Sequence, residues 1–273
     1  MSVTVTLALR ASLQTDIELD GVTADRIAGL SEQEIAALPV RVGARQVELG
    51  EFFSVRGARS ARVRVEGALT HVHGLGAGMA GGEMHIDGDA GRRVAARMTG
   101  GSVEVHGSVG DEAGVAMAGG TLRITGSAGD RVGAAEARAS KGMTGGEIVV
   151  VGSVGAEAGA RARRGLVVVA GDTGDDAARA MIAGTLVVLG RTGGEPGRAS
   201  KRGTIIAVGG IVVPIIYWHA CTFEPPHVRL TMTYLRRRYG LAIDDRVAGG
   251  RYRRHCGEAG AHSRGEILEW TGQ

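Results

Sequence analysis

The chain has 273 residues, a net charge of +3 and a hydrophobic fraction of 44%, so it is long and apolar enough to bury a core. Glycine supplies 47 residues but does not recur at every third position, which excludes collagen and predicts frequent tight turns. No stretch approaches the ~20 apolar residues of a membrane span, and no secretion signal is visible. With two cysteines, Cys221 and Cys256, and no CxxC pair, we expect a cytoplasmic protein without disulfides or membrane association.

The basic residues do not follow a nucleic-acid-binding pattern. All but two of the 32 are arginines, and some cluster in the tail as RRR at 236–238 and RYRRH at 251–255. No aromatic platform alternates with them, and no known nucleic-acid-binding motif is present. We predict no nucleic acid among the partners and favour an acidic protein surface.

Residues 1–59 are predicted to form a small α/β capping segment at the N-terminus. VTVTLAL, at 3–9, alternates as a strand does. TADRIAGLSEQEIAALPV, at 23–40, is typical of a helix, with Thr23 or Ser31 as its N-cap.

Residues 60–213 contain a repeat marked by glycine doublets and by single glycines. One glycine of each repeat returns every 19 residues, except for one step of 26, where seven residues near 134–140 are inserted. These glycines are Gly82, Gly101, Gly120, Gly146, Gly165, Gly184 and Gly203. Such a regular period predicts stacked units, each too small to bury its own apolar face.

Each repeat is predicted to contain a strand, a turn, a second short strand and another turn. Alternate strand residues are apolar, as Val103 and Val105 are, and GxxGxxxG follows the strand, which rules out a helix there. A methionine expected in the core precedes most doublets: Met79, Met98, Met117, Met143 and Met181. We predict an all-β solenoid, a right-handed parallel β-helix of about seven 19-residue GxxGxxxG turns with small N- and C-terminal capping segments.

The outward positions of the predicted strands change character along the chain. They begin with His85, Glu104 and Arg123 and become aliphatic in the last four turns. An apolar face of this extent requires a cover, which is either the protein's own terminal segments or another subunit. We interpret it as a candidate partner interface made of Val149, Val151, Leu166, Val168, Val187, Leu189, Ile206 and Val208.

Residues 214–273 are predicted to form a C-terminal capping and partner-binding tail. The repeat stops at Pro214, HVRLTMTYLRRRYG at 227–240 reads as a helix, and the remainder is expected to be irregular.

Candidate catalytic groups are few. His85, Glu104 and Arg123 would lie about 5 Å apart on adjacent turns, a place where β-helix enzymes acting on polysaccharides keep catalytic groups, but a charge-compensated polar ladder is the favoured interpretation. His71 and His73 could begin a metal site, yet no third ligand is assignable. GLGAGMAGG at 74–82 lacks the strand and helix of a dinucleotide fingerprint. We therefore assign no catalytic, cofactor or metal residue to this chain.

The repeated MxGGxIxVxG turns, the GxxGxxxG phrases and the phrase LGEFFSVRG at 49–57 resemble two known families. One is the C subunit of formylmethanofuran dehydrogenase, and the other is the C-terminal domain of the glutamate synthase large subunit. The resemblance covers roughly residues 1–213, and the N-terminal segment favours the formylmethanofuran dehydrogenase family.

The first resemblance implies a non-catalytic scaffold subunit in one-carbon metabolism. Its complex would transfer formyl from formyl-tetrahydromethanopterin to methanofuran and release formate. The implied partners are an amidohydrolase-like component (A), a second component (B) and a formyltransferase component (D), with the metal on another subunit and no cofactor bound by this chain. The arginine-rich, lysine-poor composition favours the bacterial formyltransferase/hydrolase complex over its methanogen relatives.

Two alternatives stay open. A free-standing domain like the glutamate synthase C-terminus would serve ammonia transfer, and neighbouring glutaminase and flavin synthase genes would indicate it. A polysaccharide-acting β-helix enzyme centred on His85, Glu104 and Arg123 is disfavoured, because a secretion signal would be expected.

Overall fold

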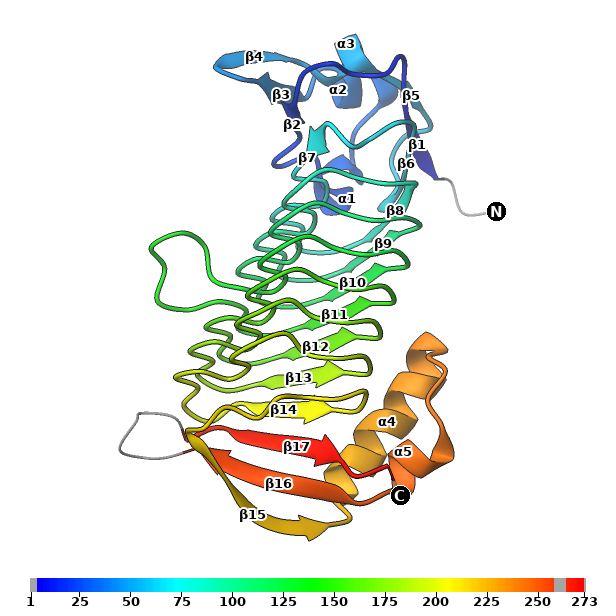
Figure 1. The fold of residues 1–273 in the computed structure, drawn as a ribbon. Coiled ribbons are helices and arrows are strands. Elements are labelled where there is room, and N and C mark those ends of the chain that lie inside the picture. The colour runs from blue at the N-terminus through cyan, green and yellow to red at the C-terminus, as the bar shows by residue number, and fades with distance from the viewer. Residues whose placement is uncertain (1–3, 258–263, 273) are drawn as a thin grey trace.

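The computed structural model describes residues 4–257 and 264–272. This part of the chain is mostly β, as predicted, with one sheet of 13 strands, one of four strands and five helices. The order in the large sheet is β15-β16-β17-β14-β13-β12-β11-β10-β9-β8-β6-β1-β5. Figure 1 shows successive coils of the chain stacked along one long axis between two end regions. None of the five helices has the length and apolar character needed to cross a membrane.

Eight parallel strands of the large sheet come from successive repeats. They are β6 (Arg62–Glu66), β8 (Glu83–Asp87), β9 (Ser102–Val105), β10 (Thr121–Ile124), β11 (Glu147–Val150), β12 (Leu166–Val169), β13 (Thr185–Val188) and β14 (Thr204–Ala207). Residues at equivalent repeat positions lie side by side, as Val103, Leu122 and Ile148 do. One repeat therefore advances the chain by one strand. The inserted residues before β11 form a loop beside the stack and leave the register unchanged (Figure 1).

The inward-facing side chains of these strands fill the core. Val103 and Val105 are at most 1% exposed, and the five predicted core methionines are equally buried. A second line of contacts consists of single parallel bridges that join Leu69, Ala90, Val109, Ala128, Val154 and Thr173. The second short strand predicted for each repeat is thus reduced to one bridge per coil, because turns occupy the rest of the coil.

The N-terminal region closes one end of the large sheet. Strand β1 (Val5–Leu9) pairs in parallel with β6 and antiparallel with β5 (Phe53–Arg56). The four-stranded sheet has the order β4-β3-β2-β7, with β2 (Ile17–Glu18), β3 (Pro39–Val42), β4 (Arg45–Glu48) and β7 (Val72–His73). Helix α3 (Leu49–Phe52) connects β4 to β5. The N-terminal region is therefore continuous with the stacked coils through strand pairing.

The single helix predicted across 23–40 is wrong, because the structure contains two short helices. They are α1 (Ala24–Ile27) and α2 (Glu32–Ala36). The Ser31 side chain accepts a hydrogen bond from the Glu34 backbone N–H, while the Glu34 carboxylate accepts one from the Ser31 N–H. This capping box holds Ser31 at φ −75° and ψ 166°, an extended conformation that ends the helical path. Thr23 precedes α1 but makes no side-chain cap bond.

The C-terminal region contains the predicted helix, α4 (Pro226–Tyr239), but the rest is not irregular. It forms α5 (Asp245–Gly249) and strands β15 (Tyr217–Phe223), β16 (Tyr252–Gly257) and β17 (Glu266–Trp270). Strand β17 pairs in parallel with β14, with Leu268 beside Ile206, and β16 and β15 continue the sheet in antiparallel fashion. The prediction of an irregular tail is wrong because these strands pair with the edge of the last coil, which would otherwise be open.

Candidate functional site

The outer face of the large sheet has a polar part and an aliphatic part. Strand register aligns one row of outward residues across successive strands: His85, Glu104, Arg123, Val149, Val168, Val187, Ile206 and Leu268. The change from charged to aliphatic residues falls between β10 and β11. The two parts therefore meet different surroundings.

Helix α4 covers the aliphatic part. Val228, Met232 and Leu235 recur at helical spacing and are fully buried, so they form one apolar face of the helix. This face packs in one cluster with Val149, Val168, Val187, Ile206 and Leu268 of the sheet. Figure 1 shows α4 beside this end of the sheet. The chain thus supplies its own cover.

Of the two covers expected for this face, the structure shows the chain's own C-terminal segment, which corrects the interpretation of the face as a partner interface. Val149, Val168, Val187 and Ile206 are at most 1% exposed, because the chain's own C-terminal helix lies over them, and no partner protein can reach them there. Three further residues of the predicted interface are partly buried against the same cluster: Leu166, Leu189 and Val208. Val151 keeps 38% exposure and remains the most accessible of the set.

Two tyrosines of α4 bind one carboxylate of the sheet. The Tyr234 hydroxyl donates to Glu147 at 2.8 Å, and the Tyr239 hydroxyl donates to the same carboxylate. Burial, reinforced by this carboxylate, raises the pKa of both phenols above the ordinary tyrosine value. The polar contact fixes where the C-terminal half of α4 meets β11.

These raised pKa values predict alkaline loss of stability. A phenol whose pKa is raised by folding stabilises the folded chain fully below the unfolded value of about 10, and the contribution falls as pH rises beyond it. We expect a constant urea midpoint up to about pH 9, then a decline that is shallower in Tyr239→Phe. Urea titrations followed by circular dichroism across this range check it. Equal declines in wild type and variant would contradict the role of Tyr239.

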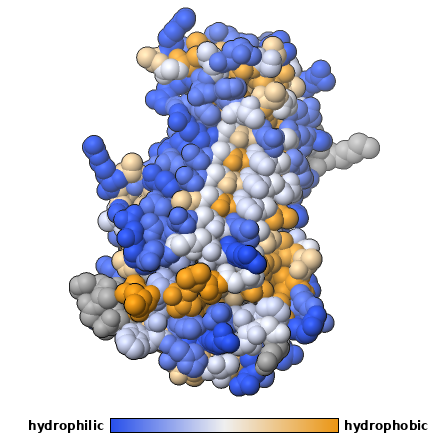
Figure 2. All heavy atoms as spheres, in the orientation of Figure 1, coloured by the Kyte–Doolittle hydropathy of each residue, from blue (hydrophilic) through white to orange (hydrophobic). Residues whose placement is uncertain are grey.

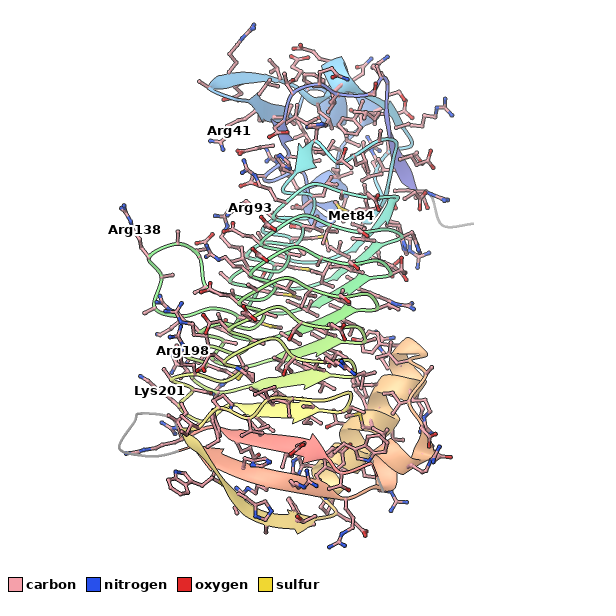
Figure 3. All side chains as sticks on the ribbon, in the orientation of Figure 1. Arg41, Met84, Arg93, Arg138, Arg198 and Lys201 are labelled. Atoms are coloured by element: carbon pink, nitrogen blue, oxygen red, sulfur yellow. The ribbon has the colours of Figure 1, made fainter. Side chains whose placement is uncertain are left out.

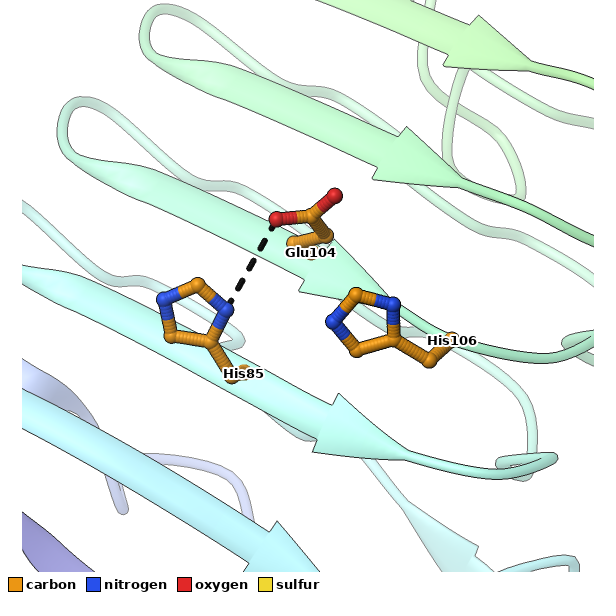
Figure 4. A group of neighbouring side chains, drawn as sticks. All are labelled: His85, Glu104 and His106. Carbon is orange, nitrogen blue, oxygen red and sulfur yellow. Dashed lines mark ion pairs between the residues drawn. The ribbon is translucent and has the colours of Figure 1, made fainter.

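The polar part brings the predicted His85, Glu104 and Arg123 together. The distance from His85 Nδ1 to Glu104 Oε2 is 3.7 Å, and Arg123 Nη1 donates to Glu104 Oε1 at 3.1 Å. Arg123 also donates to the Tyr239 carbonyl at 3.4 Å, so the last turn of α4 borders this group. His106, which sequence reasoning did not include among the candidates, has its ring stacked parallel to that of His85 at 6.3 Å between centroids. Figure 4 shows His85, Glu104 and His106 on one face of β8 and the end of β9.

His71 and His73 have the carboxylate neighbour that sequence alone did not assign. The distance from His71 Nδ1 to Asp16 Oδ1 is 2.7 Å, and that from His73 Nε2 to Asp16 Oδ2 is 3.2 Å. These bonds, chiefly the one to His71, lower the pKa of Asp16. The other ring nitrogen of His73 accepts the Arg92 N–H. Each imidazole lies against a different carboxylate oxygen, and hydrogen bonds join His71 to Asp16 and His73 to the Arg92 backbone N–H.

The two cysteines are free thiols. Cys221 is exposed and Cys256 is half-buried, and neither forms a disulfide. The imidazole of His255, the residue before Cys256, forms a hydrogen bond with Glu269, and the distance from His255 Nε2 to Glu269 Oε2 is 3.0 Å. Among residues 4–257 and 264–272, no hydrogen bond joins either thiol to an imidazole that could act as its base.

A charged cleft of about 600 Å³ lies where the N-terminal region meets the first coils. Five arginines and five carboxylates line it, and they pair with one another, as Arg93 and Glu112 do at 2.9 Å. Figure 3 shows Arg41 and Arg93 on the same side of the molecule as Arg138, Arg198 and Lys201. Because its charges balance, the cleft does not select strongly for an anion.

The sequence interpretation missed an exposed apolar segment between β14 and β15. Val212 is 78% exposed and Ile215 is 95% exposed, and Trp218 at the start of β15 is 66% exposed. Figure 2 shows hydrophobic side chains gathered at this end of the visible face. The apolar run IVVPII at 211–216 is visible in the sequence. The sequence interpretation assigns it to the end of the repeat and not to a surface segment of its own.

Comparisons with known proteins find relatives in one family. The C subunit of a molybdenum-containing formylmethanofuran dehydrogenase from Methanosarcina barkeri is 34% identical over 95 residues, 33% of this chain and 32% of that protein. The C subunit of the formyltransferase/hydrolase complex from Methylorubrum extorquens is 35% identical over 89 residues, 33% of this chain and 34% of that protein. These alignments span about a third of each relative's length. A scan against models of protein families finds no match.

A solved structure extends the likeness to nearly the whole chain. A chain in the crystal structure of the Methylorubrum extorquens formyltransferase/hydrolase complex with methylofuran is 34% identical, with a TM-score of 0.89. The superposition covers 97% of this chain and 99% of that one, so it includes the terminal regions together with the repeats. The chain belongs to the family formed by the C subunits of formylmethanofuran dehydrogenase and of the formyltransferase/hydrolase complex.

Proposed function

We propose that this chain is a non-catalytic scaffold subunit of a formyltransferase/hydrolase complex. The observation that carries the proposal is the 97% superposition, at 34% identity, on a chain of such a complex. Ion pairs such as Glu104 with Arg123 and His255 with Glu269 add support, because they occupy side chains that acid–base catalysis could otherwise use. A long, regular stack of coils is well suited to holding larger subunits at fixed separations.

The stack itself is proposed to be a right-handed parallel β-helix. The parallel register of β6 and β8 to β14 and the line of single bridges both support one coil per repeat. The 13-stranded sheet also extends into both end regions. The two edges of this sheet are therefore β15 and β5, which lie outside the stacked coils.

The proposed complex acts in the cytoplasm on one-carbon units. It would transfer formyl from formyl-tetrahydromethanopterin to a methanofuran-type carrier and hydrolyse the product to formate. The amidohydrolase-like component (A), the second component (B) and the formyltransferase component (D) would carry the catalysis, including any metal it requires. This chain would hold those components and bind neither carrier.

The exposed apolar segment is the proposed contact with those components. Val212, Ile215 and Trp218 are close in sequence at the start of the C-terminal region and are too exposed to serve this chain's own core. A few residues near the centre of an interface contribute most of its binding energy, and tryptophan is frequent among them. This segment replaces the covered aliphatic face as the candidate partner surface.

Co-expression with the amidohydrolase-like, second and formyltransferase components of the same organism tests the proposal. We expect the four chains to copurify, formate release by the complex and none by this chain alone. We expect Ile215→Asp to reduce copurification at least tenfold, because it places a charge at an apolar contact. Leu230→Asp is the matched control, since Leu230 is 72% exposed on α4, outside this segment.

Two results would count against the proposal. Turnover of the formyl substrate by the isolated chain would show that it is not a passive scaffold. Unchanged copurification of Ile215→Asp, with circular dichroism showing a folded chain, would mean that the partner components bind elsewhere.

A further inference from the structure

We propose that His85, Glu104 and His106 form a binding site for a divalent transition-metal ion of the Zn²⁺ class. The site goes beyond the scaffold role and does not depend on it. Among residues 4–257 and 264–272, this is the group of three histidine, cysteine or acidic side chains whose possible ligand atoms all lie within 4.8 Å of one another. Figure 4 shows that their rings and carboxylate share one face of the sheet.

Strand register brings the three residues together. His85 and Glu104 are direct neighbours across the parallel strands β8 and β9. His106 lies two residues beyond Glu104, so its side chain emerges on the same face. The His106 backbone N–H donates to the Ile86 carbonyl at 2.8 Å, which keeps the end of β9 attached to β8. Backbone pairing therefore places the three side chains next to one another without a bound ion.

The inward neighbours of these residues make the backbone rigid. Ile86 and Val105 are fully buried in the core and alternate with the three polar residues along β8 and β9. A ligand set on packed strands loses less conformational freedom on binding than one on a loop. Metal binding at this site would therefore require rotation of the side chains but no movement of the backbone.

The distances suit a tetrahedral ion once the side chains have rotated toward it. Zinc binds imidazole nitrogen and carboxylate oxygen at about 2.0–2.2 Å, which places its ligand atoms about 3.3 Å apart. His85 Nδ1 and Glu104 Oε2 are already 3.7 Å apart. Two nitrogen ligands and one oxygen favour zinc and its neighbours over Mg²⁺ or Ca²⁺, which take oxygen ligands.

Arg123 fits the role of orienting the carboxylate. It donates to Glu104 Oε1, which leaves Oε2 directed to His85, and it is itself held by the Tyr239 carbonyl. Hydrogen bonds of this kind fix a ligand's orientation in metal sites. His106 is exposed and the His85 side chain is 44% exposed, so a fourth position would be open to water.

Zinc titration of the untagged full-length chain tests the site, using competition with a chromophoric chelator. We expect one Zn²⁺ per chain, at least tenfold weaker binding in His106→Ala and in Glu104→Gln, and a rise in Tm on zinc addition that both variants lose. The matched control is His71→Ala, which removes an imidazole from the Asp16 network and should bind zinc as wild type does.

Cobalt substitution identifies the ligands independently of affinity. We expect visible bands typical of nitrogen and oxygen ligands, absent from His106→Ala. Equal zinc binding by wild type and both site variants would overturn the proposal. A thiolate charge-transfer band would also overturn it, because it would place the ion on Cys221 or Cys256, the two free thiols. Circular dichroism confirms that each variant is folded.

Discussion

Val168→Asp is expected to lower the free energy of unfolding by about 4 kcal/mol and to release α4 from the sheet. Val168 is fully buried between Val149 and Val187, beneath the apolar face of α4. A carboxylate there would lie in an apolar cluster without a basic partner, so it must take up a proton or reach water by displacing the helix. Urea denaturation measures the loss, and limited proteolysis between β14 and α4 reports the release of the helix.

Val151→Asp is the matched control for this change. Val151 follows β11 on the same sheet, but it is 38% exposed, and we expect a change of less than about 0.5 kcal/mol. If Val168→Asp and Val151→Asp denature at the same urea concentration with equal proteolysis, α4 does not cover this face in solution.

Gly107→Ala is expected to cost about 3 kcal/mol by forcing two coils apart. A Cβ at Gly107 would lie 2.4 Å from the Gly88 carbonyl carbon and 2.7 Å from the Asp89 nitrogen. Both are backbone atoms of the preceding coil, so no side-chain rotation can relieve the contact. Glycine recurs at this position because the coils stack with no room for a side chain. The urea midpoint, followed by circular dichroism, measures the cost.

Gly81→Ala separates this effect from the general effect of replacing glycine. A Cβ at Gly81 meets no atom within 4 Å, and its φ lies outside the left-handed region. We expect the urea midpoint of Gly81→Ala to equal or slightly exceed that of wild type, since alanine reduces the freedom of the unfolded chain. Equal losses in Gly81→Ala and Gly107→Ala would mean that coil contacts do not decide the requirement for glycine.

Local patterns predicted the repeating part of the fold. Period-two alternation identified residues such as Val103 and Val105 as inward, and both are buried. The 19-residue spacing placed His85, Glu104 and Arg123 on adjacent strands, which the register confirms. These inferences succeeded because each depends on contacts between neighbouring coils, and the spacing of the repeat sets those contacts.

The failures occurred where the repeat ends. Ser31 could lie inside one long helix or begin a second one. Its hydrogen bonds with Glu34 in the structure show that it begins the second helix, α2. Strands β15 to β17 lack a glycine pattern, and their pairing depends on the open edge of β14. His106 was not grouped with His85 and Glu104, although the same register that joins those two also places it nearby.

The amino-acid sequence by itself determined the stack, its inward face and the change of its outer face from polar to aliphatic, because each follows from residue spacing within one repeat. Only the tertiary structure decided what covers the aliphatic half. The covering residues of α4, such as Val228 and Leu235, lie far along the chain from Val149 and Val168 and share no period with them. Their contact arises when the C-terminal strands extend the sheet and bring α4 onto the aliphatic face. A contact between residues so far apart in the chain produces no periodic pattern from which it could be predicted.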